Sequence, residues 1–290
     1  MPSAPVPSPR ARLRAILSGP RCVKMASVFD PISARIAADL GCEAALVGGS
    51  LVSHAVLGAP DLILLTLTEL AEQVGRCTRA ADVPLVVDGD HGYGNALNVM
   101  RTVVELDRAG AGALMIEDTD LPRPYGPSGA PRLLPFDEGL GKVRAAVAAR
   151  GDSGLPILGR TGAATITGVD DAIARLRAFE DAGVDGLFVP GVETREDLDR
   201  IAGAVRLPLV IGVAGAAVAD PGYLADRGVR LWSGGHQVFA VAVNALHAAM
   251  KVVHAGTPST ALPGIAPADL FERLTRADAY RRDVRDFLGG

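Results

Sequence analysis

The chain has few of the residues that build disulfide frameworks, membrane spans or nucleic-acid surfaces. Its 290 residues include only three cysteines, Cys22, Cys42 and Cys77, which lack CxxC spacing and predict reduced thiols. Aromatic residues make up 4% of the sequence, and no apolar run reaches membrane-spanning length. The net charge is −4 and basic residues do not cluster, which argues against nucleic acid as a partner. No signal-peptide pattern opens the chain, so we expect a cytoplasmic protein.

What the chain does contain is an alternation of short apolar runs and helix-length segments. The runs are apolar and β-branched on consecutive positions, as in parallel strands buried on both faces. They are residues 23–27, 44–48, 85–90, 113–118, 156–161, 186–190, 207–213 and 230–233. Eight strand–helix units in about 250 residues predict an α/β fold, a (β/α)8 TIM-type barrel. A doubly wound sheet is the alternative, but its glycine-rich dinucleotide fingerprint is missing.

Glycines support this segmentation. Gly41, Gly110, Gly183 and Gly228 each stand between a helical segment and the next apolar run, where a helix needs a left-handed C-terminal residue.

The chain ends suggest a domain organisation in three parts. Residues 1–9, rich in Pro and Ser, predict a disordered tail, and residues 10–255 predict the barrel domain, with its last helix at 237–254. Residues 256–290 predict a C-terminal helical extension, with one helix over 268–288 after a Gly- and Pro-rich loop. A helix beyond the eighth unit needs a surface to cover, either on its own barrel or on a neighbouring subunit, which leaves an oligomer open.

Acidic residues close two neighbouring strands. Asp88 and Asp90 end one apolar run, Glu117 and Asp118 end the next, and a single helix-length segment lies between the runs. A strand, a helix and a parallel strand bring the two carboxyl ends side by side. Close like charges repel unless a cation lies among them, and Mg²⁺ suits few carboxylates plus waters. Helix N-capping is the alternative use of such acids, but three acids meeting at adjacent strands favour a metal site.

Three further strand ends carry candidate residues. The turn Gly48-Gly49-Ser50 offers backbone N–H groups and a hydroxyl that suit a carboxylate, although it could be an ordinary tight turn. Arg160 either pairs with the acids or clamps a substrate carboxylate. His236 could polarise a carbonyl, hold a second carboxylate or cap a helix. The loop over 118–135 has the length and composition of an active-site lid or of an irregular surface loop.

These motifs resemble those of the isocitrate lyase / phosphoenolpyruvate mutase superfamily over about residues 12–255. The most specific matches are VVDGDHGYGNALNVMRTVVELDRAGAGALMIED, GGSLVSHAVLGAPD, GRT at 159–161 and the late GGHQ. The resemblance implies a direct Mg²⁺ contact from Asp88 and support, largely through water, from Asp90, Glu117 and Asp61. It also implies an α-keto-carboxylate site at Gly48, Gly49 and Ser50, and a substrate carboxylate on Arg160. The superfamily is usually tetrameric, with C-terminal helices swapped between paired subunits.

The composition of the loop over 118–135 bears on which reaction of this superfamily the chain catalyses. Residues 118–135 contain no Cys, Lys or His, whereas the lyase branch carries a catalytic Cys there and the mutase branch carries Lys and Asn groups. The sequence is most similar to the bacterial oxaloacetate decarboxylase branch, which shares DHGYGNALNVMRTVVEL and the IEDT start of the lid. It departs from that branch at Gly162 and in VIGVAGAA at 210–217.

The resulting hypothesis is Mg²⁺-dependent decarboxylation of oxaloacetate to pyruvate and CO2 through an enolate, with Mn²⁺ as the other metal. Arg160 and His236 would orient the remote carboxylate. The alternatives are a C–C lyase or aldolase acting on an alkylmalate-type 2-hydroxy acid, with Tyr93 as a base, and phosphonopyruvate hydrolysis. A barrel that binds a dicarboxylate without catalysis is the non-enzymatic alternative.

Overall fold

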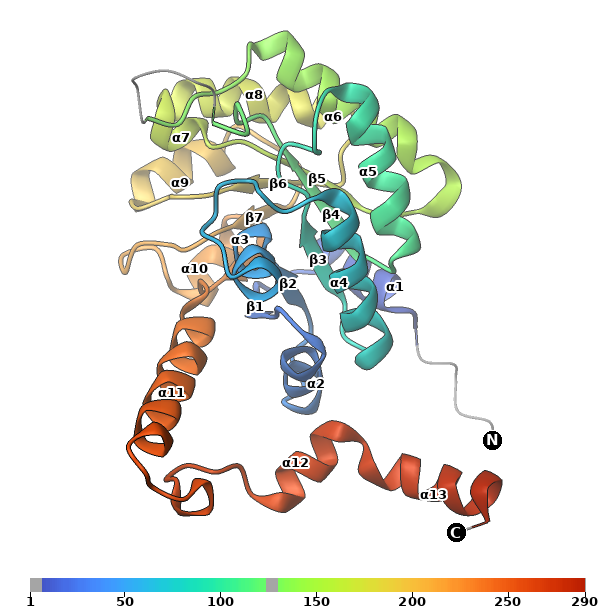
Figure 1. The fold of residues 1–290 in the computed structure, drawn as a ribbon. Coiled ribbons are helices and arrows are strands. Elements are labelled where there is room, and N and C mark those ends of the chain that lie inside the picture. Colours follow the sequence, from blue (N-terminus) through green and yellow to red (C-terminus); the bar gives the residue numbers. More distant parts are fainter. Residues whose placement is uncertain (1–6, 124–129, 290) are drawn as a thin grey trace. The chain divides into compact units, whose positions relative to one another are not determined.

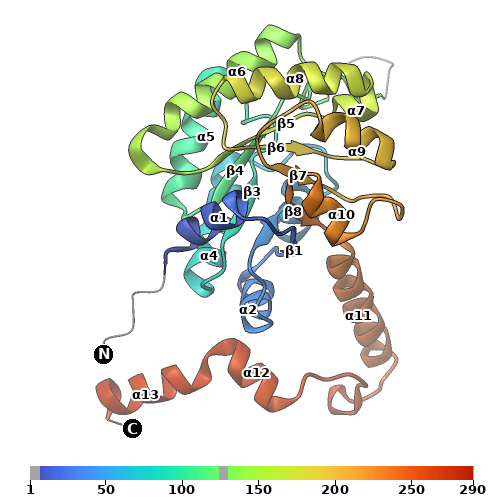
Figure 2. The same cartoon turned by 180° about the vertical axis from the view of Figure 1, so that it is seen from behind.

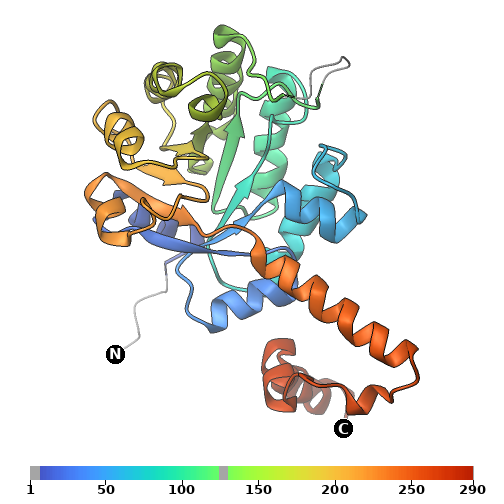
Figure 3. The same ribbon diagram turned by 90° about the vertical axis from the view of Figure 1, so that its left-hand side faces the viewer.

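Eight parallel strands close into a barrel in sequence order, and β8 pairs back onto β1. This computed structural model describes residues 7–123 and 130–289. The strands are β1 Val23–Ser27, β2 Ala45–Val47, β3 Leu85–Asp88, β4 Ala113–Glu117, β5 Ile157–Arg160, β6 Gly186–Val189, β7 Leu209–Ile211 and β8 Val229–Ser233. Figures 1 and 3 show them at the centre of the barrel, with helices outside them. The predicted TIM-type barrel is confirmed. Most strands are shorter than the predicted runs because the end residues already turn into loops.

The helices of the barrel follow the predicted segments. They are α1 Pro9–Ser18, α2 Pro31–Asp39, α3 Gly49–Val52, α4 Leu67–Ala80, α5 Ala96–Arg108, α6 Phe136–Arg150, α7 Ala163–Ile166, α8 Val169–Asp181, α9 Arg195–Ala202 and α10 Pro221–Asp226, with a π-helical turn at Ser53–Leu57 and a 3-10 turn at Gly151–Ser153. The four glycines predicted to close helices all have left-handed φ angles, from 73° at Gly41 to 91° at Gly183. Asn95 caps α5 by accepting hydrogen bonds from the N–H groups of Leu97 and Asn98.

Strand alternation divides the apolar side chains into two layers. One set fills the barrel interior, and its members include Met25, Leu46, Val86, Met115, Leu158, Phe188, Val210 and Leu231. The other set packs between the strands and the surrounding helices. Leu13 and Leu17 of α1 join the interior set, so α1 lies against the barrel (Figure 2). Because successive side chains of a strand point to opposite faces, the residue two places beyond an interior residue also faces the barrel axis.

The C-terminal unit, residues 236–290, is compact by itself. It holds α11 Gln237–His254, which matches its prediction, a 3-10 turn at Ser259–Ala261, α12 Ala268–Thr275 and α13 Ala277–Leu288. Contacts within the chain place the boundary between Gly235 and His236, so α11 groups with these helices. The predicted domain limits at residues 9 and 255 stay a prediction, and most of the predicted tail lies outside the described residues.

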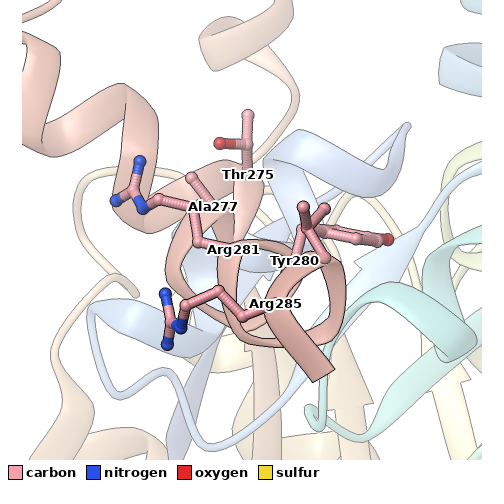
Figure 4. A pocket seen from close by; sticks show the side chains of 6 residues that line it. Thr275, Ala277, Tyr280, Arg281 and Arg285 are labelled. Atoms are coloured by element: carbon pink, nitrogen blue, oxygen red, sulfur yellow. The ribbon is translucent and has the colours of Figure 1, made fainter. Parts of the chain in front are cut away.

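The prediction of one helix over 268–288 is wrong. Arg276 has a left-handed φ of 59° and ends α12, because its N–H bonds back to the carbonyls of Glu272 and Arg273. Arg281 of α13 then pairs with Glu272 of α12 at 2.9 Å and with Asp278 at 2.6 Å, which stabilises the break. Figure 4 shows Arg281 beside Thr275 and Tyr280 in the pocket at this corner. Among residues 7–123 and 130–289, no helix combines the length and the apolar character needed to cross a membrane.

Candidate active site

Three charged residues end neighbouring strands at the carboxyl end of the barrel. Asp88 is the last residue of β3, Glu117 of β4 and Arg160 of β5. Each stands two positions beyond an interior residue, so all three face the barrel axis. Glu117 and Arg160 are direct register partners across β4 and β5. The predicted convergence of strand-end residues on one small volume is therefore present.

Arg160 forms the centre of an inner ion cluster, which we define as Asp88, Asp90, Glu117 and Arg160. Its Nη1 donates to Asp88 Oδ2 at 2.5 Å, and its Nε lies 3.4 Å from Glu117 Oε2. Its guanidinium carbon lies 5.4 Å from the ring centroid of Phe188, within cation–π range. Burial disfavours the charged form, but the carboxylates outweigh it and raise the pKa of Arg160. Of the two uses predicted for Arg160, the structure has the pairing with the acids; the substrate clamp stays a prediction.

Asp90 joins this cluster through an unusual backbone. Its φ is 47°, a left-handed value that Asp tolerates better than most residues, and its N–H points to Asp88 Oδ1 at 3.3 Å. A Cβ placed on Gly49 would lie 2.6 Å from an Asp90 carboxylate oxygen, so a larger residue there would displace the Asp90 carboxylate. Burial and then the charges of Asp88 and Glu117 raise the pKa of Asp90 well above its usual range. Gly49 of the Gly48-Gly49-Ser50 turn therefore lies directly against one of the acids.

Glu117 is fixed from two sides. The Thr119 hydroxyl donates to its Oε2 at 2.6 Å, and its own N–H donates to the carbonyl of Asp90 at 2.9 Å. It is 5% exposed, and burial raises the pKa of its carboxyl group against the opposing charge of Arg160. Asp118, in contrast, does not join the acids. It faces the helices, where Arg175 and Thr161 donate to it at 2.9 and 3.2 Å.

The donor chemistry of the inner ion cluster fits a hard divalent cation. Three carboxylates face one guanidinium, and burial followed by the charges of Asp88 and Glu117 raises the pKa of Asp90. Among the residues that the structure describes, no group of three or more His, Cys, Asp or Glu side chains is arranged to ligate an ion directly. A site with one direct carboxylate and several waters needs no such group, and Mg²⁺ commonly binds in that way. The assignment of Asp88 as the direct ligand, with Asp90, Glu117 and Asp61 in support, stays a prediction.

The remaining predicted site residues differ in how closely they approach the acids. The Tyr93 hydroxyl lies 3.5 Å from Asp90 Oδ2, and burial together with Asp90 and Asp88 raises the pKa of Tyr93. Asp61 is exposed in the loop after α3, yet its charge contributes to the raised pKa of both Asp90 and Tyr93. Ser50 is half-buried in α3. His236 precedes α11 in the C-terminal unit, so its predicted role stays a prediction.

Sequence reasoning missed several residues beside the site. Lys142 of α6 is 4% exposed, and burial lowers the pKa of its ammonium group although the charges of Glu138 and Glu117 oppose that shift. His91 is 4% exposed, and burial followed by the charge of Lys142 lowers its pKa to about 4. The motif EGLGKVRAA contains Lys142 and was the available signal for it. Phe188 carried no signal, because an aromatic inside a strand reads as ordinary core.

The loop predicted over 118–135 begins and ends as a short antiparallel ladder. Thr119 bridges to Leu133, the Asp120 N–H donates to the Arg132 carbonyl, and the Leu134 N–H donates to the Asp118 carbonyl, the last two at 2.8 Å. Arg132 also pairs with Asp120 at 2.8 Å. Residues 124–129 lie outside the described residues, so the role of the loop as a lid stays a prediction.

The chain resembles known proteins in both its sequence and its structure. Residues 13–254 match the family described as phosphoenolpyruvate phosphomutase. The chain is 62% identical over 281 residues to an oxaloacetate decarboxylase of Paraburkholderia xenovorans (strain LB400), which covers 97% of this chain and 94% of that protein. A solved oxaloacetate acetylhydrolase in complex with oxalate superposes with a TM-score of 0.85 at 26% identity, covering 98% of this chain and 99% of that one. A solved 2,3-dimethylmalate lyase gives 0.86 at 26% identity, with 97% of each chain covered.

Proposed function

Because the chain belongs to the phosphoenolpyruvate phosphomutase family, a family of enzymes, we propose that it is a lyase that decarboxylates oxaloacetate to pyruvate and CO2 in a metal-dependent reaction. The observation that carries this proposal is the 62% identity, over almost the whole chain, to a protein named oxaloacetate decarboxylase. The inner ion cluster supports it, because its excess of buried carboxylates suits a divalent cation.

In this proposal Asp88 would be the direct ligand of Mg²⁺, Asp90, Glu117 and Asp61 would support it, and Mn²⁺ would be the substitute metal. When bound, the metal supplies Lewis-acid polarisation of the substrate's keto oxygen. Arg160 already carries its charge beside Asp88 and Glu117 and is stacked on Phe188, so it is oriented before a substrate carboxylate arrives.

The chain's own residues can serve the bond changes of decarboxylation. The C–C bond to the β-carboxylate breaks, CO2 leaves, and the electron pair remains on the three-carbon fragment as an enolate. Backbone N–H groups at Gly49 and Ser50 face the carboxylate end of that fragment in this proposal. A proton then converts the enolate to pyruvate, and the Tyr93 hydroxyl, which lies 3.5 Å from Asp90 Oδ2, is our candidate donor. No strong base is needed at any step.

The direct test is pyruvate formation from oxaloacetate with and without Mg²⁺, followed with a coupled dehydrogenase. We expect metal-dependent turnover well above the spontaneous rate. Asp88→Asn should remove it, whereas Asp170→Asn, a change in an exposed pair with Arg200, should not. Turnover at the spontaneous rate in the wild type would reject the decarboxylase. Titration with oxalate then distinguishes a barrel that binds dicarboxylates without catalysis from one that does not bind them.

A second candidate is a C–C lyase for an alkylmalate-type 2-hydroxy acid. The similarity to 2,3-dimethylmalate lyase favours it. Retro-aldol cleavage requires a base to remove the hydroxyl proton, and the raised pKa of Tyr93 makes it a poor one. A screen of oxaloacetate, 2,3-dimethylmalate and phosphonopyruvate separates the two candidates and includes the C–P hydrolase alternative. Turnover of dimethylmalate in excess of oxaloacetate would favour the lyase.

The C-terminal unit supports a proposal about assembly. Helix α11 has no buried residue, and its exposed apolar side chains include Val241 at 68%, Leu246 at 60% and Met250 at 64%. Such a surface is typical of an interface. We propose a cytoplasmic location, where the free thiols stay reduced. For the assembly, we propose a homotetramer in which these helices are exchanged between paired subunits. Light scattering should give the mass of four 29.9 kDa chains, and Val241→Asp with Leu246→Asp should give smaller species.

A further inference from the structure

A second ion cluster lies behind the first, on the helix side of β4 and β5. We define this outer ion cluster as Asp118, Asp171 and Arg175, with Thr161. Arg175 of α8 donates from Nη1 to Asp118 Oδ2 at 2.9 Å and from Nε to Asp171 Oδ2 at 3.0 Å. Its side chain is 9% exposed and that of Asp118 is 0% exposed. A buried arginine thus meets one fully buried acid, Asp118, and one partly exposed acid, Asp171, at a position that the proposed reaction does not use.

The outer cluster is joined to the inner one through the backbone. Asp118 directly follows Glu117, and Thr161 directly follows Arg160, so each strand end carries one inner and one outer residue. The Thr161 hydroxyl donates to the same Asp118 oxygen at 3.2 Å. The ends of β4 and β5 are therefore linked on both faces of the sheet.

Arg175 also holds the returning end of the 118–135 loop. Its Nη1 donates to the carbonyl of Leu134 at 3.2 Å, and its guanidinium carbon lies 5.6 Å from the ring centroid of Phe136. The Leu134 N–H donates to the carbonyl of Asp118, which closes the ladder. Arg175 thus fixes both ends of the ladder at once.

The ladder in turn carries the group that orients a site carboxylate. Thr119 bridges to Leu133 within the ladder, and its hydroxyl donates to Glu117 Oε2 at 2.6 Å. A continuous path of contacts therefore begins at Arg175, passes through Asp118 and Leu134, and ends at Thr119 and Glu117. Hydrogen bonds from outside the direct ligand set are what fix a metal-site carboxylate in one orientation.

We propose that Arg175 is a positioning residue for the proposed metal site, and that it sets the orientation of the Glu117 carboxylate through the 118–120 and 132–134 ladder and the Thr119 hydroxyl. The proposal rests on the proposed function for its metal. It assigns a role in the reaction to a side chain on the far side of the sheet from the substrate.

The experiment measures Mn²⁺ affinity by electron paramagnetic resonance, alongside turnover and urea unfolding. Four variants are compared with the wild type: Arg175→Met, Arg175→Lys, Thr119→Val and Arg177→Met. Arg177 is the matched control, because it lies on the same helix, is exposed and donates to the Ala204 carbonyl. Thr119→Val keeps the side-chain shape and removes the hydroxyl alone, which guards against a failure of Arg175→Met to fold.

We expect Arg175→Met and Thr119→Val to weaken Mn²⁺ binding by roughly ten- to a hundredfold. Arg175→Lys should recover part of the loss, and Arg177→Met should match the wild type. A merely structural role would lower the urea midpoint of Arg175→Met but leave Mn²⁺ affinity in folded Thr119→Val unchanged, and that result would overturn the proposal. If the wild type binds Mn²⁺ but does not turn over oxaloacetate, the proposed function fails. The Mn²⁺ affinities of the variants still decide whether Arg175 is a positioning residue.

Discussion

The two ion clusters that lie back to back on β4 and β5 differ in how their charges balance. In the inner cluster three carboxylates face Arg160, and burial raises the pKa of both Asp90 and Glu117. In the outer cluster Arg175 bonds to both acids and to a carbonyl, and Thr161 adds a further donor. The barrel-axis side of these strands thus has the larger excess of carboxylates, and on the helix side Arg175 bonds to both acids of its cluster. A buried excess of charge is expected where a cation binds and a reaction takes place. Charges that are paired with one another are expected where they stabilise the fold.

The largest effect should come from removing a charge on the inner side. Asp88→Asn deletes the proposed direct ligand and also the 2.5 Å partner of Arg160. We expect a loss of about a thousandfold or more in metal-dependent turnover, or about 4 kcal/mol, because a catalytic metal supplies several kcal/mol. The measurement is the coupled pyruvate assay at saturating Mg²⁺. Activity within tenfold of the wild type would contradict the proposed division between the clusters.

A substitution in the outer cluster should mainly lower the free energy of unfolding. Arg175→Met leaves Asp118 charged and fully buried without its partner, which typically costs about 3–5 kcal/mol. Urea unfolding measures this loss, and the control Arg177→Met should change stability by less than about 0.5 kcal/mol. Equal losses in the two variants would show that Arg175 is not a special position.

Asp90 sharpens the contrast because its replacement should stabilise the protein. Without metal, Asp90→Asn removes a carboxyl whose folded pKa is raised by burial and by Asp88 and Glu117, and we expect a gain of about 0.5–2 kcal/mol at neutral pH. A raised folded pKa favours the folded state below the unfolded pKa, about 3.9, and this benefit is lost as pH rises through the folded value. The stability gap between variant and wild type should therefore widen above about pH 4.

Added Mg²⁺ provides the control for that prediction. Metal that binds the folded state should raise the melting temperature of the wild type and reverse the gap, because the variant lacks one of the supporting carboxylates. A variant that is less stable than the wild type in the presence of EDTA would show that Asp90 is not under electrostatic strain.

The smallest effect should follow from Phe188→Leu. The ring lies under the Arg160 guanidinium at 5.4 Å, and a buried cation–π contact contributes about 0.5–2 kcal/mol. We expect KM for oxaloacetate to rise a few-fold while kcat changes less, because the substituted side chain orients a binding group. Steady-state kinetics measures both constants, and a change confined to kcat would place Phe188 elsewhere in the reaction.

The sequence predicted the barrel because each strand is a run of buried apolar residues, a pattern that depends on few neighbours. It also predicted which acids meet, since strand alternation alone puts Asp88 and Glu117 on the barrel axis. Alternation likewise separates Glu117 from Asp118, which the pattern of adjacent acids had grouped together.

What could not be predicted depends on contacts between distant segments. The hydrogen bond between Arg175 and Asp118 joins residues 57 positions apart. It depends on which face of α8 is turned toward β4, and the sequence does not specify that orientation. The break at Arg276 was missed because no Gly or Pro marks it, and it depends on the pairing of Arg281 with Glu272. The orientation of Arg160 over Phe188 depends on the register between β5 and β6.

Helix α1 also has a consequence for how the chain folds. Arg12 bonds to Asp82, Arg10 to the carbonyl of Ser153 and Arg14 to Asp185, so its partners lie 70, 143 and 171 residues further along. Contacts of such wide separation form slowly, because the intervening chain must be ordered first. During synthesis α1 leaves the ribosome before each of these partners and cannot complete its contacts until they have emerged. The contacts of α1 are therefore completed only after the segment that leads into β6 has been made.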